Sequence, residues 1–362
     1  MAAERAFNID TRFASNVKIF GHPEWLERYR RGERVYPICW EIDASNRCPY
    51  NCEHCCWGDF IEGHGDIMPE ARLTKVLSEI KDLGGKSIIW SGGGDPLTHP
   101  NIVEVIRKSH DLGLENAMFT NGLGMTPKRA EELAGVLSWI RFHVGADNSS
   151  DFAKVHGVPE KFFSRALENI KNFCAVKERT ANVGIGVPVN PDNFAGCKGL
   201  PDLAMSLGAD FFQAKLDLLR LGDFAYSEWW YETVVPYFAA AKERLQGRVR
   251  FFSNTEQSAL TPDYCHAHRI ITAVTADGRV AFCKMQRDDK KTSLGNIHEQ
   301  SLREIMDGER HRLLAETINL ETCGVAQVHC PYRKTIQAIE IQLRNPDEMP
   351  PIPDTMEYIN FF

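Results

Sequence analysis

Apolar residues in the first two thirds of the chain follow two alternating patterns. After Pro69 they recur every three or four residues from Leu73 to Leu83 and stop at Gly84, a pattern that predicts a helix. Short continuous apolar runs lie between such segments and predict strands. We expect six strands, at positions 37–44, 87–91, 116–120, 139–145, 182–190 and 210–218. Because helical segments connect these strands, the pattern predicts a parallel sheet, either open or curled into a barrel.

The pattern changes after about residue 245. Two β-rich runs flank Asp277 and Gly278 and predict a hairpin, and two short helices are expected near 302–306 and 311–318. A proline-rich tail leads to the sequence MEYINFF, which is apolar enough that we expect it to dock on the body. We therefore expect an N-terminal extension at 1–34, a barrel at 35–245, a second domain at 246–335 and a tail at 336–362.

Composition excludes several classes of function. The chain has 42 basic and 49 acidic residues, and its net charge of −7 predicts no surface for nucleic acid or for an anionic membrane. It has no apolar run of about 18 residues and no signal-peptide core at its start, so we expect a cytoplasmic protein. Its 11 cysteines, without an export signal, predict metal binding or catalysis rather than disulfides.

The most informative stretch follows the first predicted strand. Three cysteines of one loop are spaced C-x3-C-x2-C, at Cys48, Cys52 and Cys55. Iron–sulfur clusters normally take four thiolates, so three would leave one iron open to another ligand. The spacing also leaves open a zinc site, whose fourth ligand would be His54, His64 or Cys56.

A glycine-rich turn, Ser91-Gly-Gly-Gly-Asp-Pro-Leu, follows the second predicted strand. Glycines at a strand end let the backbone approach a ligand closely, and a carboxylate beside them suits a ligand amine. Ligands of parallel sheets lie outside the carboxyl ends of the strands, so this turn and the cysteine loop are expected on one face. By itself the motif is equally consistent with a simple turn.

Together these residues resemble the radical S-adenosylmethionine (SAM) enzymes. The cysteine spacing matches, His54 stands where the family has an aromatic residue, and Gly93-Gly94-Asp95-Pro96 is similar to its Gly-Gly-Glu-Pro motif, with Asp for Glu. The resemblance implies a partial (β/α)6 barrel and a [4Fe–4S] cluster on the three cysteines, with SAM on the open iron. It also implies reductive cleavage of SAM to a 5′-deoxyadenosyl radical that takes a hydrogen atom from substrate.

The same resemblance implies a set of SAM-binding residues. The turn Gly93–Asp95 would hold the methionine amine, and Asn121, at the end of the third strand, would contact SAM. His143 falls at the place of a ribose-binding serine, and Lys154 in the stretch FAKVHG could reach the SAM carboxylate. For the last two residues, a satisfied strand histidine and a solvated helix lysine are the simpler interpretations.

A second group of cysteines lies near the C-terminus, at Cys265, Cys283, Cys323 and Cys330. Four cysteines around a hairpin predict one closed metal site, for which zinc and iron–sulfur are equally compatible. The spacing Cys265-x12-Gly278-x4-Cys283, followed by SLGNI, resembles the SPASM/twitch extension of radical SAM enzymes. Four cysteines fit the shorter twitch form, which implies one auxiliary [4Fe–4S] cluster that moves electrons.

The resemblance leaves the reaction open, and the first hypothesis is dehydrogenation of a small polar molecule of sugar, aminocyclitol or nucleoside type. The auxiliary cluster would accept the electron, and a reductant such as flavodoxin or ferredoxin would feed the SAM cluster. Glu41 falls at the place of a substrate-facing glutamate of the aminocyclitol dehydrogenases; a salt-bridged structural carboxylate is the plainer interpretation. Lys215 and Arg220 could bind substrate oxygens or take up a proton.

The second hypothesis is an epimerase or maturase of ribosomal peptides, in which Cys197, expected in a loop near the active face, could give a hydrogen atom to a substrate radical. Only 34 residues precede the predicted barrel, too few for an independent peptide-recognition domain. The third is a non-catalytic metal-binding protein or electron carrier, which would not need the glycine turn. We expect the first, an oxidoreductase with a small-molecule substrate.

Overall fold

The computed structural model describes residues 18–58, 65–217, 224–246, 250–252, 264–318, 323, 330–345 and 357–362. Ten strands in this part of the chain form one sheet. They are β1 (Cys39–Asp43), β2 (Ser87–Ser91), β3 (Glu115–Thr120), β4 (Trp139–His143), β5 (Asn182–Val189), β6 (Phe211–Leu216), β7 (Arg250–Phe252), β8 (Ile271–Val274), β9 (Arg279–Ala281) and β10 (Ser293–Asn296). Their order in the sheet is β10-β9-β8-β1-β2-β3-β4-β5-β6-β7.

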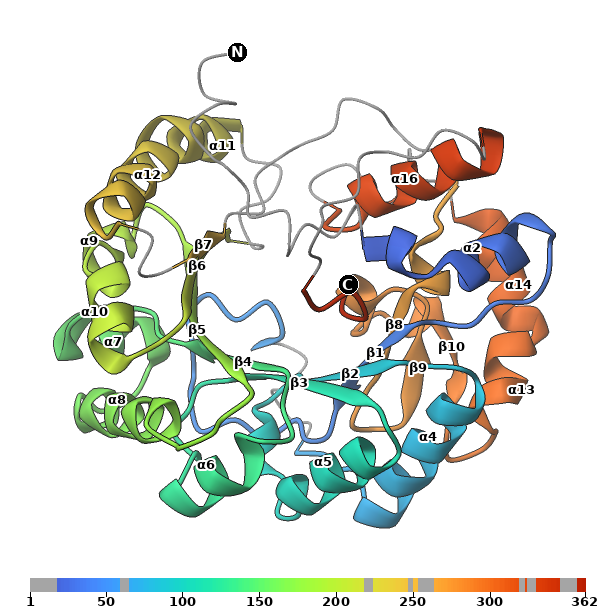
Figure 1. The fold of residues 1–362 in the computed structure, drawn as a ribbon, viewed down its shortest axis with the longest axis horizontal. Helices are drawn as coiled ribbons and strands as arrows, with labels where there is room; N and C mark the ends of the chain where they lie inside the picture. Colours follow the sequence, from blue (N-terminus) through green and yellow to red (C-terminus); the bar gives the residue numbers. More distant parts are fainter. Residues whose placement is uncertain are drawn as a thin grey trace.

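Strands β1 to β7 are parallel and curve into a partial barrel (Figure 1). The C-terminal part joins the same sheet, because β8 pairs in parallel with β1, and β9 and β10 follow antiparallel. The partial (β/α)6 barrel with a C-terminal extension is thus confirmed. The strands described in this extension all belong to the barrel sheet.

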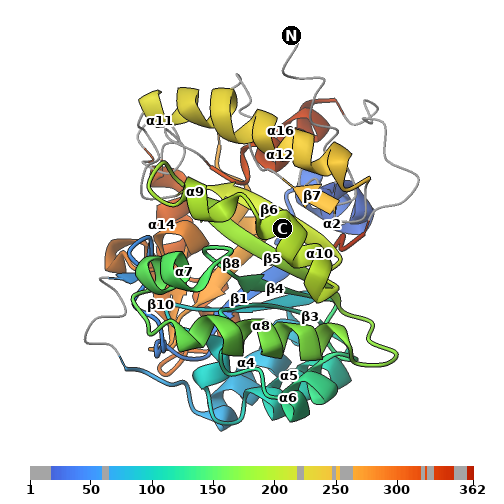
Figure 2. The same ribbon diagram turned by 90° about the vertical axis from the view of Figure 1, so that its left-hand side faces the viewer.

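The described α-helices are α2 (Pro23–Arg30), α4 (Glu70–Asp82), α5 (Ile102–Asp111), α6 (Pro127–Leu133), α7 (Ser149–His156), α8 (Lys161–Cys174), α9 (Phe194–Cys197), α10 (Leu200–Leu207), α11 (Phe224–Trp229), α12 (Val235–Arg244), α13 (Leu302–Asp307), α14 (Glu309–Thr317) and α16 (Arg333–Arg344). Of these described α-helices, α2 precedes β1 and the others lie between and after the strands. Figures 1 and 2 show α4, α5, α6 and α8 along the outer side of the curved sheet. None of the described helices is long and apolar enough to cross a membrane.

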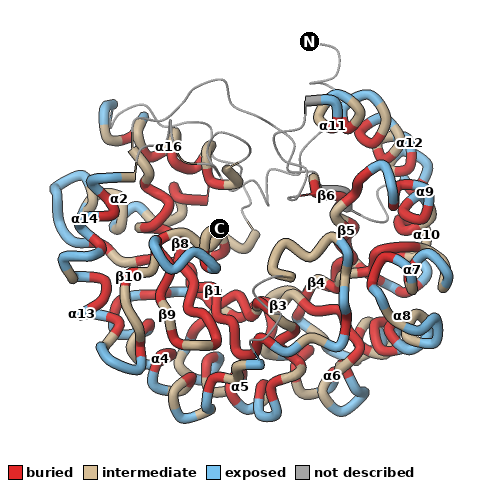
Figure 3. The backbone as a smooth tube through the Cα atoms, turned by 180° about the vertical axis from the view of Figure 1, so that it is seen from behind, coloured by how far each residue is buried: buried red, intermediate tan, exposed pale blue. Residues whose placement is uncertain are grey.

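The main hydrophobic core lies between the outer face of the sheet and the helices. On the inner face, side chains do not fill all of the space. On β4, Ile140 and Phe142 are fully buried, whereas Trp139, Arg141 and His143 keep accessible surface. Alternate residues of a strand point to opposite faces, so the accessible set faces the inside of the curve. Figure 3 shows how the buried segments gather along the strands and the adjoining sides of the helices. Closed barrels fill their interior with side chains; here the inner face of β4 stays accessible.

The final residues dock on the body, as predicted. Phe361 is buried with Ile89 and Ala117 on the inner face, and the Lys18 ammonium donates to the Phe361 carbonyl over 2.7 Å. The Asn360 side chain reaches Glu115, the first residue of β3. This C-terminal segment therefore covers the amino ends of the strands, away from the cysteine loop at their carboxyl ends.

All six predicted strands, the hairpin and the two short helices are confirmed, with shifts of a few residues at their ends. The described elements that were not predicted include α2, β7, β10 and α16. The proline-rich stretch 346–356 lies outside the described residues.

Candidate active site

Two loops meet at the carboxyl ends of β1 and β2. The N–H of Gly94 donates to the Ser45 carbonyl (3.2 Å), and that of Asp95 donates to the Arg47 carbonyl (2.8 Å). A Cβ at Gly94 would lie 2.1 Å from the Arg47 oxygen, so only glycine permits this approach. The glycine turn therefore packs directly on the segment that leads into Cys48.

The Asp95 carboxylate is buried and engaged by the protein itself. It accepts hydrogen bonds from the N–H groups of Leu97 (2.9 Å) and Asn121 (2.7 Å) and from the Thr120 hydroxyl (2.8 Å). These contacts fix the turn against the end of β3. The Asn121 amide in turn lies 3.8 Å from the Cys48 sulfur, so this residue lies beside the cysteine loop, directly after β3.

The three thiols of the cysteine loop lie close enough to influence one another. Burial, then the charges of Asp95 and Cys55, raise the pKa of Cys48 to about 12. Burial and the other two thiols also raise the pKa of Cys52. Thiols in such surroundings become thiolates when a metal compensates their charge, so this donor set fits an iron–sulfur cluster.

Three histidines surround the cysteine loop. The Nε2 atoms of His54 and His143 are 2.9 Å apart, and the two rings stack. His156, the last residue of α7, accepts the Gly145 N–H at Nε2 (2.9 Å), so its proton must sit on Nδ1. That Nδ1 lies 3.0 Å from the Cys52 sulfur and is placed to donate to it.

The four C-terminal cysteines also gather. Burial, then the neighbouring thiols of Cys283, Cys330 and Cys323, raise the pKa of Cys265. Among the described residues, no three Cys, His, Asp or Glu side chains stand close enough to hold one metal ion. A [4Fe–4S] cluster separates its ligands more widely, because each thiolate binds its own iron, and the four-cysteine set fits that larger group. Cys265 and Cys330 pack against an apolar cluster that includes Phe361 and Cys39, the first residue of β1, and this places them toward the amino ends of the strands.

A buried charge network lies on the inner face between the two cysteine groups. Arg287 pairs with both Glu41 and Asp43 (2.5 Å to Asp43), and the Lys284 ammonium lies 2.9 Å from Glu41. Against the effect of burial, the two cations hold the pKa of Glu41 well below its ordinary value. Burial, opposed by Arg287 and reinforced by Glu41, raises the pKa of Asp43 to about 6. The guanidinium also lies 4.8 Å from the Trp57 ring, so Arg287 links the C-terminal part to β1 and to the cysteine loop.

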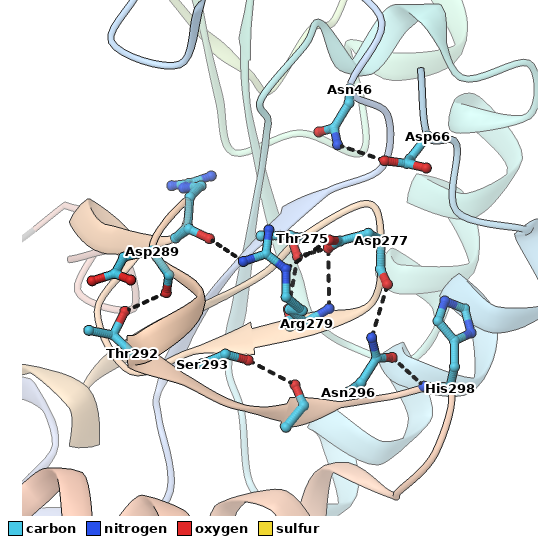
Figure 4. Close-up of polar contacts among 12 residues, drawn as sticks. Asn46, Asp66, Thr275, Asp277, Arg279, Asp289, Thr292, Ser293, Asn296 and His298 are labelled. Atoms are coloured by element: carbon cyan, nitrogen blue, oxygen red, sulfur yellow. Dashed lines mark hydrogen bonds and ion pairs between the residues drawn. The ribbon is translucent and has the colours of Figure 1, made fainter. Parts of the chain in front are cut away.

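The β8–β9 hairpin fixes the backbone of Arg287. Asp277 in its turn binds Thr275 and Arg279, and the Asn296 amide donates to the Asp277 carbonyl over 3.1 Å (Figure 4). Arg279 also donates to the Arg287 carbonyl (3.3 Å). The hairpin predicted from Asp277-Gly278 thus positions a residue of the inner face.

Comparisons with known protein families identify two domains, each of which contains one of these cysteine groups. The sequence model of the radical SAM superfamily matches residues 42–196, which hold the cysteine loop and the glycine turn. The chain belongs to the radical SAM superfamily. The model of the iron–sulfur cluster-binding domain SPASM matches residues 265–331, which hold the four C-terminal cysteines. This radical SAM enzyme therefore uses SAM and [4Fe–4S] clusters as cofactors.

Several proteins resemble this radical SAM enzyme at low identity. The AdoMet-dependent heme synthase of Methanosarcina barkeri is 25% identical over 82% of this chain and 88% of its own length. The PqqA peptide cyclase of Ruegeria pomeroyi is 30% identical over 48% of this chain and 45% of its own length. Among solved structures, Streptococcus suis SuiB bound to precursor peptide SuiA has a TM-score of 0.65 at 15% identity, covering 83% of this chain and 73% of SuiB. That structural likeness concerns the fold.

Two expectations about the site of this radical SAM enzyme change with the structure. Cys197 is not in a loop; it ends α9 and is fully buried in the core, where its thiol donates to the Gly145 carbonyl (3.5 Å). Apolar residues enclose it, so its thiol has no accessible surface. Lys154 is exposed on α7, and the residue of that stretch that reaches the cysteine loop is His156.

The remaining candidates are placed as follows. Lys215 lies on the inner face of β6, with its ammonium 5.3 Å from the centroid of the Phe119 ring. Arg220 lies outside the described residues. Lys284 and Arg287 were not predicted from the sequence. Both closely follow Cys283, and two basic residues beside a predicted cluster ligand could have indicated a role at the site.

Proposed function

We propose that this radical SAM enzyme oxidatively modifies a peptide, which it holds on the inner face of the partial barrel. The observation that carries the proposal is the position of that accessible face. It lies between the cysteine loop at the carboxyl ends of the strands and the second cysteine group toward their amino ends. A substrate bound there has a radical source on one side and an electron acceptor on the other.

The peptide is inferred from the relatives. One is named for cyclising the PqqA peptide, and SuiB was solved with its precursor peptide. These names favour the peptide hypothesis over dehydrogenation of a sugar, aminocyclitol or nucleoside, which had been the first expectation. The heme synthase aligns over more of the chain, and its name supports biosynthetic radical chemistry without a peptide.

When bound, SAM and the clusters would supply one-electron chemistry: the substrate would lose a hydrogen atom on the side of the cysteine loop, then an electron to the auxiliary cluster and a proton to solvent. The chain's own residues hold and orient these partners. The turn Gly92–Asp95 sets the backbone beside the cysteine loop, and Arg287 fixes that loop to the auxiliary part through Trp57. Glu41 stays ionised, so we assign it charge balance rather than proton donation.

The test begins with the protein reconstituted with iron and sulfide under anaerobic conditions, then given SAM and a strong reductant. We expect release of 5′-deoxyadenosine by the wild type and none by Cys48→Ala. Cys283→Ala should keep that release while its iron content falls from about eight to about four per chain. Equal iron in the wild type and Cys283→Ala would contradict the auxiliary cluster, and release by Cys48→Ala would contradict the radical source.

The peptide part has its own test. Incubation with a library of short peptides, read by mass spectrometry, should reveal products lighter by two hydrogens. If no peptide gave such a product, and small polar molecules were oxidised in the presence of SAM, the result would favour the first hypothesis, dehydrogenation of a small polar molecule.

A further inference from the structure

The inner face has two sides with different charge. Near β1, two cations neutralise the two buried carboxylates described above. Across the curve, Arg141 on β4 and Lys215 on β6 have no carboxylate within ion-pair distance among the residues that the structure describes. The charge of Glu41 acts on both residues from a distance, but Glu41 is already paired with Arg287 and Lys284, so positive charge is in excess on this side of the inner face.

The two cations are held in place by their neighbours. The Arg141 guanidinium lies 3.9 Å from the centroid of the Phe119 ring, and the Lys215 ammonium approaches the same ring at 5.3 Å. The side-chain oxygen of Gln213 accepts a hydrogen bond from Arg141. A Cβ at Gly186 would lie 2.6 Å from the Arg141 side chain, so the glycine makes room for it. Such support indicates a prepared position rather than a solvated surface charge.

Their surroundings make an anion favourable. Burial lowers the pKa of Arg141 to about 9 against the opposing charge of Glu41. Burial, with the nearby charges of Arg141 and Lys284, lowers the pKa of Lys215 well below its ordinary value, again against Glu41. Both side chains nevertheless keep some accessible surface. Desolvated cations without an ion-pair partner are costly, and an anion that reaches them from solvent relieves that cost.

The position of the pair suits a substrate. Arg141 precedes His143 by two residues on the same face of β4, which is about 6.6 Å along a strand. His143 touches His54 of the cysteine loop. An anion on the pair would therefore lie about one layer of side chains below that loop, where the reacting part of a substrate must come.

We propose that Arg141 and Lys215 bind a carboxylate of the substrate. The inference rests on the proposed function: in a peptide, that carboxylate belongs to a glutamate or aspartate next to the residue that loses hydrogen. A guanidinium offers parallel N–H donors and the ammonium adds another, a combination that matches a carboxylate. SAM has a carboxylate too, so the experiment must separate the two sources.

The probes are two capped peptides, Ac-Gly-Glu-Gly-NH2 and Ac-Gly-Gln-Gly-NH2, and the small dicarboxylate glutarate. Binding is measured by ligand-observed NMR on the iron-loaded protein with SAM. The variants are Arg141→Met and Lys215→Met, and their matched controls are Arg107→Met and Lys171→Met, exposed residues of α5 and α8. SAM affinity, iron content and 5′-deoxyadenosine release are recorded on the same preparations.

We expect the wild type and both controls to prefer the glutamate peptide by roughly tenfold or more, the range of a charge-assisted hydrogen bond. Each inner-face variant should lose most of that preference and keep its SAM affinity within about twofold. Glutarate binding without peptide binding would support the carboxylate site and contradict the peptide substrate. Equal binding of both peptides without glutarate binding, or a matching loss of SAM affinity in the variants, would overturn the inference.

Discussion

Arg287 is the residue on which the charge balance of the inner face depends. Replacing it with methionine leaves Glu41 and Asp43 in a buried site with a single cation, Lys284. Arg287 and Glu41 are each 3% exposed and Asp43 is fully buried, so solvent cannot compensate. Removing one partner of a buried ion pair costs about 3–5 kcal/mol, and we expect Arg287→Met to lose about 4 kcal/mol of unfolding free energy.

That loss of unfolding free energy predicts a fall in melting temperature. An unfolding entropy of about 2.1 cal/mol/K per residue amounts to about 0.76 kcal/mol/K for a chain of 362 residues. The melting temperature of Arg287→Met should therefore fall by about 5 °C. Adding Asp43→Asn should recover part of the loss, because one uncompensated carboxylate is then gone.

The assay is differential scanning calorimetry of iron-loaded protein at one scan rate and neutral pH. Arg312→Met, an exposed arginine 66% accessible in its side chain, is the control and should stay within about 1 °C of the wild type. A fall of less than 1 °C for Arg287→Met would refute the reasoning. So would a double variant that melts no higher than the single one.

Three further predictions follow from individual contacts. His156→Leu removes the hydrogen bond to Cys52 and should lower the reduction potential of the SAM cluster by about 40 mV, the one-electron equivalent of about 1 kcal/mol. The potential is measured by redox titration with electron paramagnetic resonance, and an unchanged value would contradict the prediction. Phe361→Ala should lower the melting temperature by about 4–6 °C, as expected for a buried phenylalanine, whereas Tyr231→Ala, 40% exposed, should not. The folded-state pKa of Asp43 is raised to about 6, so the contribution of this residue to stability falls as pH rises from about 4 to about 6 and is constant above pH ~6. Asp43→Asn should remove this component from the melting temperatures measured by calorimetry across that pH range. An identical pH profile in the variant would contradict the prediction.

The parts that could be predicted from the sequence are those with local signals. The strand at 87–91 has the bounds of β2, since a short apolar run before glycines has few other solutions. The three-residue β7 and the glycine-containing β10 have no such run, and both depend on neighbours distant in sequence. Helix α16 did carry a readable pattern, with Ile336 and Ile339 buried at helical spacing.

The candidate site also combines local motifs, which could be predicted, with contacts between residues distant in sequence, which could not. The cysteine loop and the glycine turn are short motifs, and their spacing and order together carried the resemblance to a known family. The contact between Arg287 and Glu41 joins residues 246 positions apart, and it depends on β8 pairing with β1. The Arg141–Lys215 pair needs the register of β4, β5 and β6, which fixes the face that each side chain occupies. Neither relation leaves a trace in local spacing.

The pairing of β8 with β1 has a functional consequence. It hydrogen-bonds the part that carries Cys283 to the strand that leads into Cys48, and Arg287 reinforces this seam with buried ion pairs. Moving one cysteine group relative to the other would break main-chain hydrogen bonds and expose unpaired carboxylates, both of which are costly. The two redox centres are therefore held as one rigid frame. Adaptation to different substrates must then come from the accessible side of the inner face, where Arg141 and Lys215 stand.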